Sequence, residues 1–386
     1  MPDVVHVPPV DSKTCLTYAE IDLDAIAHNV RALKAHVGPG VALLAVVKAN
    51  AYGHGLVEVA RTALRHGAAG LCVARVGEGI ALRQAGITAS ILVMAYSRPD
   101  EAEAAVAHDL TLGVGDIAVA EAVSAAAVAQ GRGATVHVKV DTGMGRFGLL
   151  PAEVLPFLAR LTTLPGLRLE GIYTHFATAD AADKTYARQQ FAAFQRVLAG
   201  AEAAGYAIPL RHAANSAATI DLPETHLNAV RPGISLYGLY PSAAVSRDVP
   251  LQPALALKSR VGRVRTLPAG SSIGYDRTFI APHPMTAALV PVGYGDGYPR
   301  LNSGQGAALI NGRRAPLVGR VCMDQLVVDI SDAGPVALDD EVVLLGRQGD
   351  DCITAEELAA WAGTINYAIV TALLPRVPRL YRGGDG

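Results

Sequence analysis

The first two-thirds of the chain alternates between short apolar runs typical of strands and longer segments with helical periodicity. Segment 183–204, for example, places its large apolar residues on one helical face. Each such helix is long enough to return the chain and start the next strand parallel to the last. Eight strands are predicted, at 42–47, 69–74, 90–95, 110–114, 135–140, 169–174, 210–213 and 228–231.

Eight strand–helix units in about 200 residues predict a (β/α)8 barrel of the TIM type, with a doubly wound parallel sheet as the competing architecture. The positions of several polar residues favour the barrel. They follow the predicted strands, at the ends that a barrel gathers on one rim, where barrel enzymes carry their active sites. These positions are Lys48, 141–146, His175, Asn215, Ser216 and Arg231.

After about residue 248 the helical periodicity largely stops. Strands predicted at 255–267, 286–292, 314–320 and 341–345 are separated by Gly, Pro and Asp turns, and only 355–361 and about 365–374 have a helical pattern. We therefore predict a barrel domain over residues 15–247 and a mostly β C-terminal domain over residues 248–386. The segment 17–23 precedes the first barrel helix and is a candidate strand of the second domain.

Composition excludes several classes of partner. Hydrophobic residues make up 51 % of the chain and charged residues 18 %, which is typical of a compact protein. The net charge of −2 gives no reason to expect nucleic acid or an anionic membrane. No apolar run is long enough to span a bilayer, and residues 1–13 lack a signal-peptide pattern. Four widely spaced cysteines argue against disulfides and zinc, so we predict a cytoplasmic protein with no metal site.

The segment VVKANAYGHG, residues 46–55, places Lys48 directly after a predicted buried strand. Burial disfavours the ammonium form, and a desolvated lysine with a lowered pKa is suited to Schiff-base chemistry. Tyr52 adds a hydrogen-bond donor, and Gly53 and Gly55 predict a tight turn into a helix. From this segment alone, Lys48 is either such a reactive lysine or a surface lysine that caps a strand.

The segment KVDTGMGRFG carries a lysine on the fifth predicted strand and an arginine seven residues later, across a glycine-rich loop. Lys139 alternates with Val138 and Val140, so its side chain could point into the barrel. Arg146 could hold a carboxylate through two hydrogen bonds. The alternative is an ordinary strand-to-helix turn.

Two further segments follow the seventh and eighth predicted strands. HAANSAAT places Asn215 and Ser216 at the start of a predicted helix, and VRPGISLYG places Arg231 at a strand end, two residues before Gly233. Two adjacent helix starts at this place match the usual phosphate site of a barrel. The alternative for the first segment is an Asn-Ser cap that binds no ligand.

Other candidates are weaker. His175 is either a hydrogen-bonded histidine in the barrel mouth or a group that relays a proton or orients a neighbour. Tyr275 lies on a predicted hairpin of the second domain, where packing is the more usual role of a tyrosine. In CMDQ, residues 322–325, no histidine lies near Cys322 in the sequence, which disfavours a cysteine nucleophile.

Together these segments resemble those of alanine racemases, two-domain enzymes that use pyridoxal 5′-phosphate (PLP). The resemblance runs in order from VVKANAYGHG to NYAIVTALLPRVPR, residues 366–379, without a departure at the site positions. It implies that Lys48 forms a Schiff base with PLP, that Arg231 faces the pyridine nitrogen, and that the enzyme is a homodimer. It implies cofactor contacts from Lys48, Tyr52, Ser216, Arg231, Gly233, Ile234 and Tyr367.

The resemblance also assigns the substrate contacts: Arg146 and the backbone of Met323 would bind the carboxylate of alanine. In many family members the lysine that matches Lys139 is carbamylated, so Lys139 is a candidate for this modification. The product D-alanine would serve either as a peptidoglycan precursor or in the breakdown of alanine.

Racemisation needs a proton removed from Cα and one returned to either face, which two bases on opposite faces achieve. Following the resemblance, we expect Lys48 on one face and Tyr275, from the other subunit, on the second face. His175, towards Arg231, is expected to supply the positive charge that makes the phenol a better base. Because arginine stays protonated, Arg231 would leave the ring nitrogen unprotonated, which weakens the electron sink and suppresses side reactions.

Three alternatives stay open from the sequence. A PLP-dependent decarboxylase shares the two-domain plan, but it is expected to carry a catalytic cysteine motif, whereas CMDQ with Tyr275 upstream follows the racemase pattern. A PLP-binding carrier made of the barrel alone is disfavoured by the second domain. A serine or broad-specificity racemase differs in pocket size, which spacing in the sequence does not determine.

Overall fold

The computed structural model describes residues 15–384, which divide into two compact units. One unit is Ala25–Pro253, and the other combines the described parts of Met1–Asp24 and Ala254–Gly386. Residues 1–13, where no signal peptide is predicted, and the last two residues of the predicted second domain lie outside the described residues. Within 15–384, no helix has the length and apolar character needed to cross a bilayer.

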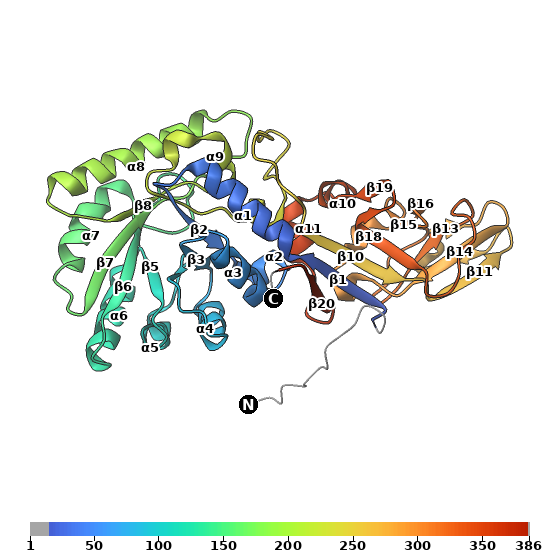
Figure 1. Cartoon of the computed structure of the whole chain (residues 1–386), viewed down its shortest axis with the longest axis horizontal. Helices are drawn as coiled ribbons and strands as arrows, with labels where there is room; N and C mark the ends of the chain where they lie inside the picture. The colour runs from blue at the N-terminus through green and yellow to red at the C-terminus, as the bar shows by residue number, and fades with distance from the viewer. Residues whose placement is uncertain (1–14, 385–386) are drawn as a thin grey trace. The chain divides into compact units, whose positions relative to one another are not determined.

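The unit Ala25–Pro253 is a closed barrel of eight parallel strands, which confirms the predicted (β/α)8 architecture and excludes a doubly wound sheet (Figure 1). The last strand closes the barrel by pairing with the first. The strands are β2 (Ala42–Val46), β3 (Gly70–Val73), β4 (Ile91–Val93), β5 (Thr111–Val114), β6 (Ala134–Lys139), β7 (Leu167–Tyr173), β8 (Leu210–His212) and β9 (Ala229–Val230).

Helices connect these strands on the outside of the barrel (Figure 1). Because side chains or helices cover both faces of each strand, β3, β4 and β5 are buried at every position. This explains why they appear in the sequence as continuous apolar runs. The helices are α1 (Leu23–Val37), α2 (Lys48–Tyr52), α3 (Leu56–Arg65), α4 (Val76–Gln84), α5 (Ala102–Ala107), α6 (Ile117–Ala129), α7 (Val154–Leu161), α8 (Thr185–Ala203) and α9 (Ser216–Asp221).

The second unit is mostly β, as predicted. It contains a seven-stranded sheet, a three-stranded sheet and a two-stranded hairpin. The larger sheet has the order β16-β15-β18-β10-β1-β20, with β19 paired to β18; its strands are β1 (Thr17–Asp22), β10 (Leu255–Arg260), β15 (Ala307–Ile310), β16 (Arg313–Pro316), β18 (Glu341–Gln348), β19 (Asp351–Ile353) and β20 (Arg379–Arg382). The remaining elements are β11 (Arg263–Leu267), β12 (Ser272–Ile273), β13 (Phe279–Ile280), β14 (Met285–Val290), β17 (Leu326–Asp329), α10 (Ala355–Ala362) and α11 (Asn366–Thr371).

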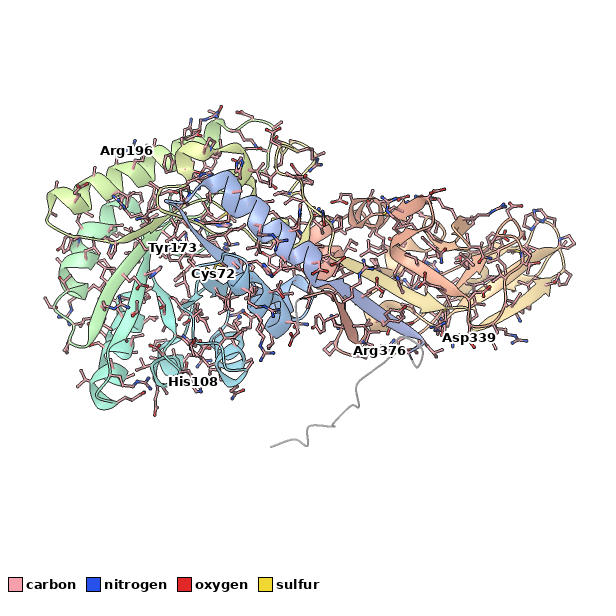
Figure 2. All side chains as sticks on the ribbon, viewed as in Figure 1. Cys72, His108, Tyr173, Arg196, Asp339 and Arg376 are labelled. Carbon is pink, nitrogen blue, oxygen red and sulfur yellow. The ribbon has the colours of Figure 1, made fainter. Side chains whose placement is uncertain are left out.

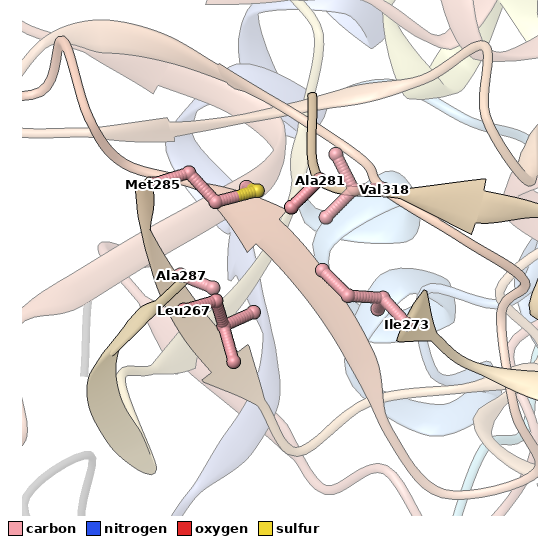
Figure 3. Close-up of a cluster of buried hydrophobic side chains, with 6 residues drawn as sticks. All are labelled: Leu267, Ile273, Ala281, Met285, Ala287 and Val318. Carbon is pink, nitrogen blue, oxygen red and sulfur yellow. The ribbon is translucent and has the colours of Figure 1, made fainter. Parts of the chain in front are cut away.

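The smaller sheet and the hairpin share a compact hydrophobic core (Figure 3). Its members come from β11, β12, β14 and neighbouring loops, and all are buried. They are Leu267, Ile273, Ala281, Met285, Ala287 and Val318.

The observed unit boundaries differ from the predicted 247/248 boundary and from the predicted barrel start at residue 15. The strand β1 pairs antiparallel with β10 and parallel with β20, so residues up to Asp24 belong to the β unit. At the other boundary, the Asn29 side chain both donates to and accepts from the backbone of Gln252, at 2.8 and 2.7 Å. These bonds hold the chain to the barrel as far as Pro253.

Two predicted strands of the β unit are wrong in extent. The run 255–267 contains two strands, because Val261 N donates to Asp340 O while Gly262 N donates to Leu289 O, and the chain passes from one sheet to another. The run 314–320 ends as a strand at Pro316, because Leu317 N donates to Gly306 O while Val318 N donates to Val327 O, and the chain leaves one sheet for another.

The close packing of β5 against Tyr173 gives a testable prediction. A Cβ at Gly113 would overlap the Tyr173 hydroxyl, which donates to Met94 O at 2.6 Å. We expect Gly113→Ala to lower the free energy of unfolding by roughly 1–3 kcal/mol, as overpacked cores do. Urea denaturation followed by circular dichroism measures this. Gly77→Ala on α4 is the control, because its Cβ meets nothing within 4 Å and should be neutral or stabilising; equal stability of the two variants would contradict the prediction.

Candidate active site

A cavity of about 400 Å³ lies at the rim of the barrel where the strands end. Its walls come from residues at or after the ends of β2, β3, β4, β6, β7 and β9, all within the barrel unit. Five residues singled out from the sequence line it, so these strand ends converge there as predicted, whereas Asn215 and Ser216 do not line it. They are Lys48, Lys139, Arg146, His175 and Arg231.

The strand before Lys48 ends one residue earlier than predicted: β2 ends at Val46, Val47 follows, and α2 begins at the lysine itself. This short element is a left-handed turn: the four residues after the lysine, Ala49 to Tyr52, have φ between 51° and 54°. Burial, together with the Arg146 cation, lowers the pKa of Lys48, while Glu78 opposes this shift. A larger share of the amine is therefore unprotonated at neutral pH than in an exposed lysine.

Lys139 lines the cavity from the end of β6, in agreement with the alternation in the sequence. Its Nζ donates to Val140 O at 2.9 Å and lies 5.3 Å from the centre of the Tyr173 ring. Burial, with Arg231 as the next cause, lowers the pKa of Lys139 to about 7. Lys139 is thus a buried amine of which a substantial share is unprotonated near neutral pH.

The loop that carries Arg146 is organised by Asp141. One carboxylate oxygen accepts N–H bonds from the three residues 143–145, and the other accepts from Arg146 N at 3.0 Å. Burial alone would raise the pKa of Asp141, but these four donors lower it, so the carboxylate stays ionised. Gly143 and Gly145 have φ of 131° and 69°, which explains the glycines of this loop.

Arg231 is buried and held by backbone carbonyls: its NH2 donates to Thr174 O at 2.8 Å and to Ala213 O at 3.2 Å. His175 lies 3.5 Å from the same nitrogen. Burial and the Arg231 guanidinium lower the pKa of His175 well below its usual range. His175 is therefore neutral at pH 7, and the expectation that it supplies positive charge is wrong; that charge resides on Arg231 itself.

A chain of hydrogen bonds that the sequence analysis missed runs from Arg231 across the barrel. Arg231 NH1 lies 2.7 Å from His212 Nδ1, His212 Nε2 lies 3.0 Å from His137 Nδ1, and His137 Nε2 lies 3.1 Å from Glu170. Since a guanidinium only donates, His212 accepts at Nδ1 and carries its proton on Nε2, from which it donates to His137. His137 in turn carries its proton on Nε2 and donates to Glu170. Burial lowers the pKa of both histidines, so both are neutral links between a buried cation and a distant anion.

Tyr173 was also missed. Its ring stacks on the His212 imidazole, with centroids 5.0 Å apart and planes 2° apart, and it forms part of the cavity wall (Figure 2 labels it). The sequence could have indicated His137, because it lies two residues before Lys139 on the same strand and its side chain therefore faces the same way. No sequence pattern indicates Tyr173 or Glu170, since their roles depend on contacts between strands.

A second group of predicted residues forms a small polar cradle beside the loops after β8 and β9. Ser216 Oγ accepts the Gly233 N–H at 2.8 Å and lies 3.0 Å from Ser235 Oγ. A Cβ at Gly233 would lie 2.6 Å from the Tyr52 hydroxyl, so only glycine fits there. Burial raises the pKa of Tyr52, which keeps its hydroxyl a donor. Hydroxyls and backbone N–H groups gathered in this way suit a phosphate.

Three predicted residues belong to the β unit and do not line the cavity. Tyr275 is 66 % exposed and Met323 is 53 % exposed, while Tyr367 lies on α11. The loop of Met323 is fixed by Arg376, labelled in Figure 2, whose guanidinium donates to Asp296 at 2.6 Å and to Asp324 at 2.8 Å. In the sequence, Arg376 stands out only as part of the longer segment 366–379.

The comparisons with known proteins agree with one another. Residues 21–241 match the family model "Alanine racemase, N-terminal domain", and residues 254–381 match "Alanine racemase, C-terminal domain". The alanine racemase of Desulfosudis oleivorans is 49 % identical, with 95 % of this chain and 97 % of that protein covered. The alanine racemase of Methanococcus maripaludis is 45 % identical, with 94 % and 98 % covered.

Solved structures give the same result. Alanine racemase from D-cycloserine-producing Streptomyces lavendulae superposes with a TM-score of 0.91 at 41 % identity, covering 96 % of this chain and 97 % of that one. The Bacillus anthracis alanine racemase with bound L-Ala-P superposes with a TM-score of 0.91 at 40 % identity, covering 97 % and 96 %. From the two domain matches and these near-full-length similarities, we conclude that the chain belongs to the alanine racemase family.

Proposed function

We propose that this chain interconverts L-alanine and D-alanine with PLP bound in its barrel. The observation that carries the proposal is the convergence of a desolvated lysine, Lys48, with Arg146 and Arg231 in one cavity of a chain from this family. A reactive amine, a carboxylate-binding cation and a buried donor are the groups that this reaction requires.

The residues present fit PLP. Tyr52, Ser216, Gly233 and Ile234 would hold its phosphate, because glycine is needed beside the Tyr52 hydroxyl and Ser216 Oγ is buried among donors. Tyr367 of the β unit would add a further contact. When bound, PLP supplies an aldehyde that joins an amine and a ring that withdraws electron density from Cα.

Lys48 is the base on one face of the substrate. Its lowered pKa favours the free amine, which can remove a proton from Cα and return it. Tyr275 is the base on the opposite face. Since Tyr275 is largely exposed in this chain, its phenol is available to a second copy, which supports a homodimer with shared active sites. The homodimer, the cytoplasmic location and a peptidoglycan role stay predictions.

Arg231 would limit how strongly a bound coenzyme ring withdraws electron density from the substrate. Its NH1 and NH2 donate to His212 and to backbone carbonyls, and a guanidinium has no lone pair with which to accept a proton. Placed at a ring nitrogen, it would donate a hydrogen bond without transferring a proton. This limits electron withdrawal and favours return of the proton over side reactions.

Arg146 and the backbone of Met323 would bind the substrate carboxylate. Carbamylation of Lys139 would place an anion beside Arg146: the neutral amine would add to carbon dioxide and release one proton, which leaves a negatively charged carbamate. The anion would then orient Arg146 through charge-assisted hydrogen bonds. The buried position of Lys139 and its pKa of about 7 supply the unprotonated amine that this addition needs.

The assignment of two bases predicts asymmetric effects of mutation. Lys48→Ala should abolish Cα exchange from both isomers, whereas Tyr275→Phe should suppress mainly proton removal from L-alanine. Each isomer is incubated in deuterated water, and deuterium at Cα and chirality are followed by mass spectrometry and chiral chromatography. Tyr206→Phe, outside the cavity, is the control. Equal residual rates from both isomers in Tyr275→Phe would refute the face assignment, and carbon dioxide release without D-alanine would indicate a decarboxylase.

The shared site predicts complementation. Lys48→Ala and Tyr275→Phe chains, each nearly inactive alone, are unfolded together, refolded together and assayed. Half of the dimers would be mixed, each with one intact site, so activity should return to roughly a quarter of wild type. Refolding each variant alone is the control. A mixture no more active than its components would mean that both bases come from one chain.

The pKa of Lys139 predicts a pH-dependent carbamate. Below pH 7 the amine is mostly protonated and cannot add to carbon dioxide, so occupancy should fall as the pH drops through about 7 and rise above it. Carbon-13 NMR with labelled bicarbonate measures the signal. Lys139→Ala should lose it, while Lys184→Ala, whose amine pairs with Asp221 at 2.8 Å, should keep it. A signal that survives in Lys139→Ala would place the carbamate elsewhere.

A further inference from the structure

The backbone after Lys48 is in a costly conformation. Ala49, Asn50, Ala51 and Tyr52 are all non-glycine residues with φ of 51–54°. In this left-handed region the Cβ of each such residue lies too close to the following carbonyl oxygen, so each one is disfavoured. The turn must therefore be held by contacts outside itself, and because it begins at the lysine, whatever holds it also sets the direction of the amine.

One carboxylate on the neighbouring helix α4 makes such contacts. Glu78, on α4, accepts the Ala49 N–H with Oε1 at 2.6 Å. Its other oxygen accepts the N–H groups of Ala74 and Arg75 at 2.9 and 3.1 Å. Glu78 thus joins the residue next to the lysine to the loop that follows β3, and each oxygen serves a different loop.

The same carboxylate is also the negative charge that acts on the lysine. The groups that influence Lys48 are the Arg146 cation, which lowers its pKa, and Glu78 and Cys72, which raise it. Burial raises the pKa of Cys72 to about 12, so this thiol is neutral at pH 7. His175 is neutral as well. Among these groups Glu78 is the anion, and it opposes a desolvation that would otherwise weaken the amine as a base.

We propose that Glu78 is a positioning residue for Lys48: its carboxylate holds the left-handed turn that aims the amine, and it supplies a negative charge at the residue next to the lysine. A lysine that alternates between a covalent bond and a free amine must return to the same place each time. A backbone anchor at the next residue provides this without occupying the cavity. The proposal rests on the role of Lys48 given above.

The test separates the two roles with matched variants of the full-length chain. Glu78→Gln removes the charge and leaves one accepting oxygen, whereas Glu78→Asp keeps the charge but is too short to reach both loops. Glu58→Gln on α3, whose carboxylate pairs with Arg61 at 3.0 Å on the surface, is the control. Two quantities are measured: the pH midpoint of Lys48 acetylation after removal of the coenzyme, and amide hydrogen exchange at residues 49–52.

In Glu78→Gln the acetylation midpoint should fall by roughly half a unit to one unit, because the opposing anion is lost. Exchange at Ala49 should become about tenfold faster or more, because one neutral amide oxygen replaces the two charged acceptors that Ala49, Ala74 and Arg75 share. Glu78→Asp should keep the acetylation midpoint of Lys48 near that of wild type, but it should not keep the slow amide exchange at Ala49. Glu58→Gln should match wild type in both.

An unchanged or higher midpoint in Glu78→Gln, or unchanged exchange at Ala49, overturns the inference. A uniform loss of protection throughout the barrel, with the midpoint unchanged, also overturns it, because it assigns Glu78 a structural role alone. Borohydride reduction of the wild-type holoenzyme separates this result from the wider proposal. If no pyridoxyl adduct forms on Lys48, the proposed function fails; if the adduct forms and the Glu78 variants behave like wild type, only the inference fails.

Discussion

Positive charge dominates the cavity at the barrel rim. Its described lining contains three arginines and two lysines but no carboxylate. Confining several cations in a partly desolvated space is unfavourable, and each raises the cost of protonating the others. The low pKa values of Lys48 and Lys139 follow from this, as does the affinity of the site for an anionic coenzyme and a substrate carboxylate.

The compensating anions lie outside the cavity and act through intermediates. Asp141 stays ionised and accepts backbone N–H groups of the loop that presents Arg146. Glu78 acts from beyond the Lys48 turn, and Glu170 reaches Arg231 through two neutral histidines. This arrangement keeps carboxylates away from the substrate, where they would repel its own carboxylate and bind Arg146 in its place. The cationic side chains stay available to bind anionic ligands, because these carboxylates form no direct ion pair with them.

Glycines and small residues determine where the bulky polar groups fit. Gly113 leaves room for the Tyr173 hydroxyl, Gly171 lies against the His137 ring, and Gly233 lies against the Tyr52 hydroxyl. In each case a Cβ would collide with a side chain at the candidate site or in the hydrogen-bond chain that leads to it. The stacked rings of Tyr173 and His212 then pack against Arg231, whose guanidinium carbon lies 5.3 Å from the Tyr173 ring centre.

The sequence alone determined the barrel, its eight strands and the residues at their ends, because apolar periodicity and strand ends are local properties of the chain. It placed Lys48, Lys139, Arg146, His175 and Arg231 correctly at one rim for that reason. Only the tertiary structure revealed that His175 is neutral, that Arg231 is linked to Glu170, and that Glu78 holds the turn after Lys48. Desolvation, tautomers and hydrogen bonds between strands depend on residues far apart in sequence, and no local pattern encodes which of them meet.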